Sequence, residues 1–146
     1  MQNIFIKKNL GPLLHKSGYN SDNLKLMIFD DNVWRKESHG PKELQFLQNY
    51  TSAILTDKES EKYVSGIAYH WYESSRTDDY PAPVLDETHM KYPNKFLLMT
   101  EACHLDGEGN GRWDFGEHYA HDIIRVSISM YKYNFILILV FFIPNL

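Results

Sequence analysis

The chain has 146 residues, of which 43% are hydrophobic and 14% aromatic. This length suits one domain or part of a larger one, and the apolar content excludes an intrinsically disordered chain. The formal net charge is −4 with no basic block, and there is one cysteine, so nucleic-acid binding, a disulfide framework and a cysteine-rich zinc site have no support.

The predicted elements alternate between helix and strand. In chain order they are a helix at residues 5–16, a strand at 24–29, a helix at 41–62, a strand at 63–69, a helix at 86–92, a strand at 96–99 and a helix at 114–130. The strands are nearly continuous apolar runs, which is typical of a parallel sheet covered on both faces. The alternation predicts an α/β fold.

Three local signals refine these predictions. Gly11 and Pro12 are expected to interrupt the first helix. Thr56 is a candidate N-cap for a last helical stretch over residues 57–63. Pro93 is expected to stop the helix that precedes the third strand.

Each predicted strand ends in residues able to do chemistry. In a (β/α)8 barrel the active site lies at the carboxyl ends of the strands. These ends offer carboxylates, a histidine, aromatic side chains and a thiol, namely Asp30, Asp31, His70, Trp71, Tyr72, Glu101 and Cys103. A complete barrel takes about 250 residues, so three strands can form only part of one.

Several runs of residues together suggest a family. They are Asn-Leu-Gly-Pro at residues 9–12, Leu-Met-Ile-Phe-Asp-Asp at 26–31, Tyr-Val-Ser-Gly-Ile-Ala-Tyr-His-Trp-Tyr at 63–72, Thr-Glu-Ala-Cys at 100–103, Trp-Asp at 113–114 and Tyr-Ala-His-Asp-Ile-Ile at 119–124. In this order they resemble the lysosomal glucosylceramidases, or acid β-glucosidases, of glycoside hydrolase family 30. The resemblance extends from about Phe5 to Ile124.

The resemblance implies a fold and an activity. The chain looks like strands five to seven of a (β/α)8 TIM barrel with their helices, and the complete enzyme would be a retaining β-glucosidase. Such enzymes use one carboxylate as nucleophile and a second carboxylic acid about 5–5.5 Å away as acid/base. The implied substrate is glucosylceramide or a related β-glucoside. Contact with a membrane surface or a lipid-presenting activator is implied for the parent enzyme. The resemblance implies no cofactor and no metal.

The family's motifs also assign site residues. The glutamate of the Glu-Ala-Cys motif is the nucleophile, which falls on Glu101. The substrate site is expected to be lined by Asp30, Asp31, His70, Trp71, Tyr72 and Cys103. Among these, Tyr72 matches a tyrosine expected to donate a hydrogen bond to the nucleophile, while Cys103 matches a cysteine close to the site and receives no chemical role.

Two departures from the family pattern affect the expected activity. The family's acid/base glutamate lies in an Asn-Glu-Pro motif, and this sequence contains none. After Ile124 the resemblance stops, and residues 135–143 are all apolar. We therefore expect a barrel fragment over residues 1–124 and an aberrant tail over residues 125–146, although a membrane anchor or a buried element also fits that tail. The isolated chain is expected to be inactive.

Two other readings stay open. Residues 106–117 follow the calcium loop of an EF-hand, but Glu108 is long for the third position and Trp113 is large for the eighth. The chain could also be a catalytically dead remnant that binds sugar or a partner. His118 and His121 are spaced to share a helix face, where a solvated or packed face is favoured over metal ligation.

Targeting signals are sparse. Residues 1–10 lack the apolar segment of a signal peptide, so none is expected in this chain. The family resemblance implies a lysosomal location for the parent enzyme. Asn49-Tyr50-Thr51 is a sequon for N-glycosylation, which suits a protein of the secretory route.

Overall fold

The computed structural model describes residues 2–33, 35–36, 42–43, 46–70, 82–101, 113–114, 116–117, 119–121 and 124. The described helices and strands follow in the order α1 (Gln2–Phe5), η1 (Ile6–Leu10), α2 (Gly11–Lys16), β1 (Met27–Asn32), β2 (Arg35–Lys36), β3 (Lys42–Glu43), α3 (Phe46–Leu55), α4 (Lys58–Glu61), β4 (Gly66–His70), α5 (Ala82–Lys91) and β5 (Phe96–Glu101). Within this part of the chain, no helix is long and apolar enough to cross a bilayer.

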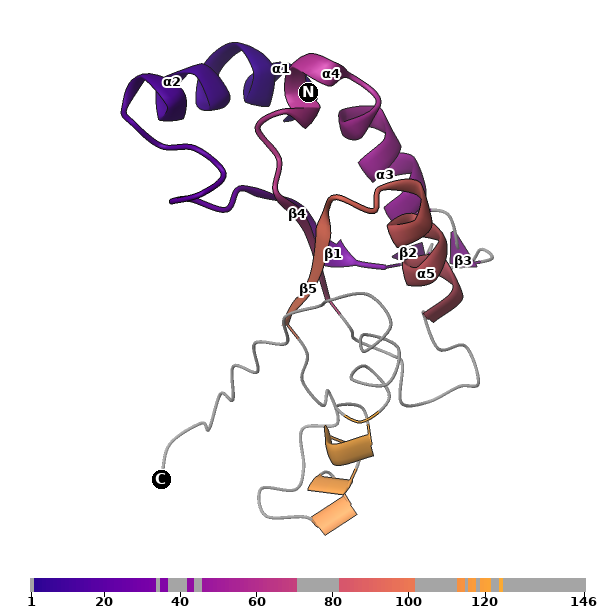
Figure 1. Ribbon diagram of the computed structural model, residues 1–146. Coiled ribbons are helices and arrows are strands. Elements are labelled where there is room, and N and C mark those ends of the chain that lie inside the picture. Colours follow the sequence, from indigo (N-terminus) through magenta and orange to yellow (C-terminus); the bar gives the residue numbers. More distant parts are fainter. Residues whose placement is uncertain are drawn as a thin grey trace.

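The sheet is parallel, as the apolar runs predict. Strand β4 lies between β1 and β5 and pairs in parallel with both (Figure 1). Its first four residues, Gly66 to Tyr69, are all buried. The three predicted strands are therefore present, but β1 and β4 begin three residues later than the predicted starts at residues 24 and 63. Each strand extends to or beyond its polar end, because backbone pairing continues past the last apolar side chain.

Helices cover the sheet along one flank and at the end where its strands begin. Figure 1 shows α3 and α5 side by side on the flank, and α1, α2 and α4 beyond the amino ends of the strands. Phe29 of β1 packs its ring against Phe46 and Tyr50 of α3, at centroid distances of 5.5 and 5.2 Å. This apolar packing fixes α3 against the strand that carries Asp30 and Asp31.

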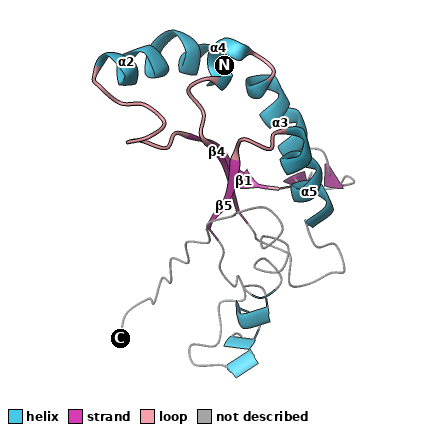
Figure 2. Cartoon of the chain, viewed as in Figure 1, coloured by secondary structure: helices cyan, strands magenta, loops and turns pink. Residues whose placement is uncertain are grey.

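The first predicted helix is present, but the predicted interruption at Gly11 and Pro12 is wrong. Residues 2–16 run through α1, the π-helical turn η1 and α2 without a break (Figure 2). Gly11 has helical backbone angles, and Pro12 lies in the first turn of α2, where its missing N–H is tolerated. The wider π-helical turn before Gly11 takes the place of the expected break.

The predicted N-cap at Thr56 is also wrong. Asp57 caps α4, since its side chain accepts a hydrogen bond from the backbone N–H of Glu59 at 3.0 Å. Thr56 instead donates to the carbonyl oxygen of Ser52 at the end of α3, over 2.6 Å. The predicted helix over residues 41–62 is thus two helices, preceded by the short antiparallel pair of β2 and β3, which the apolar pattern did not indicate.

The remaining helices differ in their ends. Helix α5 begins four residues before the predicted start at residue 86, and it ends at Lys91, shortly before Pro93. Of the predicted helix over residues 114–130, the described residues 114, 116–117, 119–121 and 124 are helical, and the others lie outside the described part. The tail predicted over residues 125–146 also lies outside it.

A buried lysine ties the amino ends of β4 and β5 together. Lys95, directly before β5, is 9% exposed. Its ammonium donates to the carbonyl oxygens of Val64 and Glu61, at 2.7 and 3.1 Å, and forms an ion pair with the Glu61 carboxylate. This pairing lowers the pKa of Glu61. All three contacts satisfy the buried charge and hold the two strands in register.

Two glycines in the runs that carry the family resemblance permit close packing. A Cβ atom at Gly11 would lie 2.3 Å from the Tyr63 ring, and one at Gly66 would lie 2.5 Å from the Phe96 ring. Each contact is far shorter than van der Waals packing allows, so the ring or the backbone must move. These glycines are therefore structural parts of the family resemblance.

We expect Gly11→Ala and Gly66→Ala each to destabilise the complete barrel protein by about 1–3 kcal/mol, through overpacking. Thermal unfolding of the variants measures the loss. Gly116→Ala is the matched control, because a Cβ atom there has no neighbour within 4 Å. Equal melting temperatures for all three variants would contradict this packing.

Candidate active site

The carboxyl ends of the three parallel strands bring the predicted polar residues to one edge. Asn32 of β1 is in register with His70 of β4, and His70 is in register with Glu101 of β5. This row stands at the edge of the sheet where barrel enzymes place their chemistry. His70 and Glu101 therefore lie side by side at this edge, and their roles in a site stay predictions.

Two bulges redirect the side chains at this edge. In β1, Asp30 has no partner in the ladder, because Phe29 pairs with Ala68 and Asp31 with Tyr69. Phe29 and Asp30 both have positive φ angles, 82° and 53°. In β5, Thr100 is the unpaired residue. Bulges are common beside active sites because the extra residue changes the direction of the side chains around it.

A direct hydrogen bond connects the two bulges, and a histidine contacts the same oxygen. The Thr100 hydroxyl lies 2.7 Å from Asp30 Oδ1 and donates to it. His70 Nε2 lies 3.1 Å from the same oxygen and 3.6 Å from Glu101 Oε2. The imidazole therefore stands between two carboxylates and is closer to Asp30.

The carboxylates at this edge are open to approach. The side chains of Glu101 and Asp30 are 55% and 66% exposed, whereas that of His70 is 17% exposed. Both carboxylates are therefore accessible from solvent. The more enclosed imidazole is well placed to orient them.

The neighbouring carboxylates of Asp30 and Asp31 have different hydrogen-bond partners. Asp30 joins His70 and Thr100, whereas Asp31 Oδ1 accepts a hydrogen bond from the backbone N–H of Asn32 at 2.7 Å. Burial raises the pKa of Tyr50 on α3, and the negative charge of Asp31 raises it further. Asp31 thus acts electrostatically on α3, while Asp30 contacts the candidate site.

Several predicted residues fall outside the described part of the chain. These are Trp71, Tyr72 and Cys103, together with His118 and most of the calcium-loop candidate over residues 106–117. Of that loop, residues 113–114 and 116–117 are described, and the Trp113 indole N–H donates to Glu117 Oε1 at 2.7 Å. Calcium binding there stays a hypothesis.

Thr100 is the residue that sequence reasoning missed. It belongs to the Thr-Glu-Ala-Cys run, but the sequence gives it no role beyond ending a strand. Its contact with Asp30 depends on the two bulges, which an apolar pattern does not encode. The available signal was its position directly before the candidate nucleophile.

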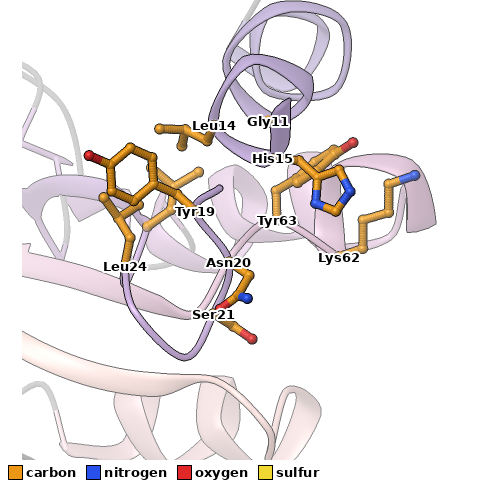
Figure 3. Close-up of a pocket in the computed structure, with 10 residues that line it drawn as sticks. Gly11, Leu14, His15, Tyr19, Asn20, Ser21, Leu24, Lys62 and Tyr63 are labelled. Carbon is orange, nitrogen blue, oxygen red and sulfur yellow. The ribbon is translucent and has the colours of Figure 1, made fainter. Parts of the chain in front are cut away.

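A cavity of about 440 Å³ lies elsewhere, near the amino ends of β1 and β4 (Figure 3). Its lining includes Leu14, His15 and Tyr19 from α2 and the loop after it, and Lys62 and Tyr63 from the segment before β4. In barrels the amino-terminal face serves stability rather than catalysis. This cavity is therefore separate from the candidate active site.

Comparisons with known proteins agree with the fold. Residues 1–134 match the model of the glycosyl hydrolase family 30 TIM-barrel domain. The chain is 43% identical over 129 residues to putative glucosylceramidase 4 of Caenorhabditis elegans, covering 86% of this chain and 22% of that protein. It is 36% identical over 131 residues to the lysosomal acid glucosylceramidase of Mus musculus, covering 84% and 22% respectively.

A solved structure supports the fold alone. The crystal structure of SrfJ from Salmonella typhimurium superposes with a TM-score of 0.60 at 21% identity, covering 84% of this chain and 24% of that one. The chain thus spans about a fifth of the length of the curated relatives it matches. The three parallel strands and their helices are part of a TIM barrel.

Proposed function

The chain belongs to glycosyl hydrolase family 30, and from that premise we propose that the protein containing it is a retaining β-glucosidase that hydrolyses glucosylceramide. Glu101 is the nucleophile of this proposal. One observation carries it: Glu101 ends a parallel strand of the barrel segment, is exposed, and lies beside His70, which also contacts Asp30. The names of the curated relatives support the choice of substrate.

The proposed reaction is a double displacement. The Glu101 carboxylate attacks the anomeric carbon, the bond to the aglycone oxygen breaks, and that oxygen takes a proton from a second carboxylic acid. A glucosyl ester of Glu101 results. The second residue then removes a proton from water, which attacks the anomeric carbon, breaks its bond to the Glu101 oxygen and releases glucose with retained configuration.

The second carboxylic acid belongs to the Asn-Glu-Pro motif of the family, which is absent from these 146 residues. A (β/α)8 barrel also needs eight strands, and the described sheet has three. We therefore propose that the active enzyme is a complete barrel, called here the full-length protein, of which this chain supplies strands five to seven. No cofactor takes part in the proposed reaction.

The division of the chain at residue 124 stays a prediction. Sequencing the full-length transcript tests it. A message that continues from Ile124 into a further barrel strand, and contains an Asn-Glu-Pro motif upstream, would support a foreign tail over residues 125–146. A message that encodes only Met1 to Leu146 would contradict the proposed enzyme, because the acid/base residue would be missing.

Product stereochemistry tests the proposed function directly. With glucosylceramide as substrate, the full-length protein is expected to release β-glucose first, which proton NMR distinguishes from the α-anomer before mutarotation. Release of α-glucose would contradict the double displacement. No release of glucose would contradict the proposed activity.

A lipid substrate such as glucosylceramide lies in a membrane, so the full-length protein must meet it at a membrane surface or through a carrier. The resemblance to lysosomal enzymes supports a lysosomal location, with contact to a membrane surface or a lipid-presenting activator. Neither contact is assigned to residues of this chain. The part of this proposal that the chain can test is entry into the secretory route.

We expect Asn49 to carry a glycan when the full-length protein is made in a eukaryotic secretory host. Asn49 is exposed on α3, whereas Thr51 is 0% exposed and donates to the Leu47 carbonyl oxygen at 2.8 Å. Sugar transfer must therefore precede the packing of α3. Mass spectrometry of the Asn49 peptide, before and after enzymatic deglycosylation, measures the modification.

Matched variants control this measurement. Asn49→Gln and Thr51→Val should remove the glycan, whereas Thr51→Ser keeps the sequon and should retain it. An unmodified Asn49 in secreted wild-type protein would contradict the expectation.

A further inference from the structure

The unpaired residues of the two bulges reach each other across the central strand. Neighbouring strands lie about 4.8 Å apart, so β1 and β5 are separated by roughly twice that distance. Nevertheless, Thr100 Oγ1 and Asp30 Oδ1 are 2.7 Å apart, above β4. Both bulges contribute to this contact, because each leaves its extra residue outside the ladder.

The same Asp30 oxygen also holds His70. Nε2 is 3.1 Å from Asp30 Oδ1, which accepts, so Nε2 carries the hydrogen in this bond. The distance from Nε2 to Glu101 Oε2 is 3.6 Å, beyond a good hydrogen bond. The Nε2–H thus donates to Asp30, while the Glu101 carboxylate lies just beyond hydrogen-bond distance.

The Thr100 hydroxyl fixes the position of Asp30 Oδ1, the oxygen that accepts the hydrogen bond from His70. Its alternative acceptor, the carbonyl oxygen of Tyr69, lies farther away, at 3.3 Å. Without the hydroxyl, the exposed Asp30 side chain has one fewer bond to hold it over β4. Its carboxylate can then turn toward solvent and release His70 to Glu101.

We infer that Thr100 is a positioning residue: through Asp30, its hydroxyl holds the N–H of His70 away from the carboxylate of Glu101. This inference rests on the proposed function. A hydrogen bond from His70 would draw charge from the Glu101 carboxylate and weaken its attack on the anomeric carbon. The same bond would not hinder the second step, in which the carboxylate leaves.

The kinetic consequence separates the two steps. With an aryl glucoside whose leaving group is highly activated, kcat reports the release of glucose from Glu101, whereas kcat/KM reports the attack by Glu101. Thr100→Val removes the hydroxyl at nearly constant shape. It is expected to lower kcat/KM by about tenfold or more, the worth of one hydrogen bond to a charged group, and to leave kcat within about twofold.

Three variants of the full-length protein serve as controls. Thr100→Ser keeps the hydroxyl and should restore kcat/KM. Asp30→Asn weakens the acceptor that Thr100 acts through, so adding Thr100→Val to it should change kcat/KM little further, in a double-mutant cycle. Thr100→Ala replaces Thr100→Val if the valine variant does not reach the wild-type melting temperature.

The results that would overturn the inference are distinct from a failure of the proposed function. Provided that the wild-type protein is active, four results would each overturn the inference alone. They are an unchanged kcat/KM in Thr100→Val, failure of Thr100→Ser to restore kcat/KM, additive effects of Thr100→Val and Asp30→Asn, and an equal fall in kcat and kcat/KM. A wild-type protein that hydrolyses no glucoside would overturn the proposed function and this inference with it.

Discussion

Replacing Glu101 with alanine in the full-length protein is expected to lower kcat for β-glucoside hydrolysis by about 10⁴- to 10⁶-fold, the range found when a nucleophilic machinery is dismantled in another hydrolase. The physical reason is that no other group on β5 can form the glucosyl ester. Initial rates with an aryl β-glucoside measure the loss. Because the Glu101 side chain is 55% exposed, a melting curve is sufficient to test for a folding defect.

Azide distinguishes a nucleophile from an acid/base residue. In Glu101→Ala, azide can occupy the space of the carboxylate and attack the anomeric carbon in a single displacement. The expected product is α-glucosyl azide, because one inversion of a β-glucoside gives the α-anomer. Rescue that yields the β-anomer would assign Glu101 to acid/base catalysis instead.

A second glutamate provides the matched control. Glu59 lies on α4, at the opposite end of the sheet, with a side chain that is 71% exposed and pairs with Lys62. Glu59→Ala removes the same atoms from a site without proposed chemistry. We expect its kcat and KM to equal those of the wild type, and a comparable loss in both variants would contradict a specific role for Glu101.

The isolated 146-residue polypeptide is expected to hydrolyse no glucoside and to lack cooperative unfolding. Loss of general acid catalysis alone is worth about 10²- to 10⁴-fold. In the described sheet, β1 and β5 each have an edge without a neighbouring strand, and open edges promote association. Large apolar side chains are also exposed on the described helices, namely Ile4, Phe5, Leu13 and Met90.

Three measurements check this expectation. Size-exclusion chromatography with light scattering should detect aggregates, a hydrophobic dye should bind, and glucoside hydrolysis should stay at background. The full-length protein under the same conditions should be monodisperse and active. A soluble, cooperatively unfolding monomer of 146 residues that cleaves a glucoside would contradict the fragment interpretation.

The apolar pattern predicted the presence of the strands and helices better than the residues at which they begin and end. The strands were found because nearly continuous apolar runs mark a buried parallel sheet, but their carboxyl ends were placed too early, since Asp30 to Asn32 and Thr100 to Glu101 belong to strands through backbone pairing. The predicted N-cap of α4, Thr56, lies one residue before the observed N-cap. Asp57 takes that position because its side chain can accept from the N–H of Glu59.

The candidate site was predicted through family motifs rather than through physics alone. Polar residues end many strands, so composition could not separate Glu101 from Asp31. Geometry adds what the motifs do not contain: Asp30 and Asp31 diverge, and Thr100 contacts Asp30. Neither follows from the sequence, because both depend on bulges and positive φ angles set by tertiary packing.

Covalent trapping tests the central claim most directly. A 2-deoxy-2-fluoro-β-glucosyl fluoride forms the glucosyl ester but slows its hydrolysis, because fluorine destabilises the positively charged transition state. The full-length protein should be inactivated with one label per molecule, and peptide mapping should find that label on Glu101. A label on another carboxylate, or turnover without any covalent label, would contradict the assignment of Glu101 as the nucleophile.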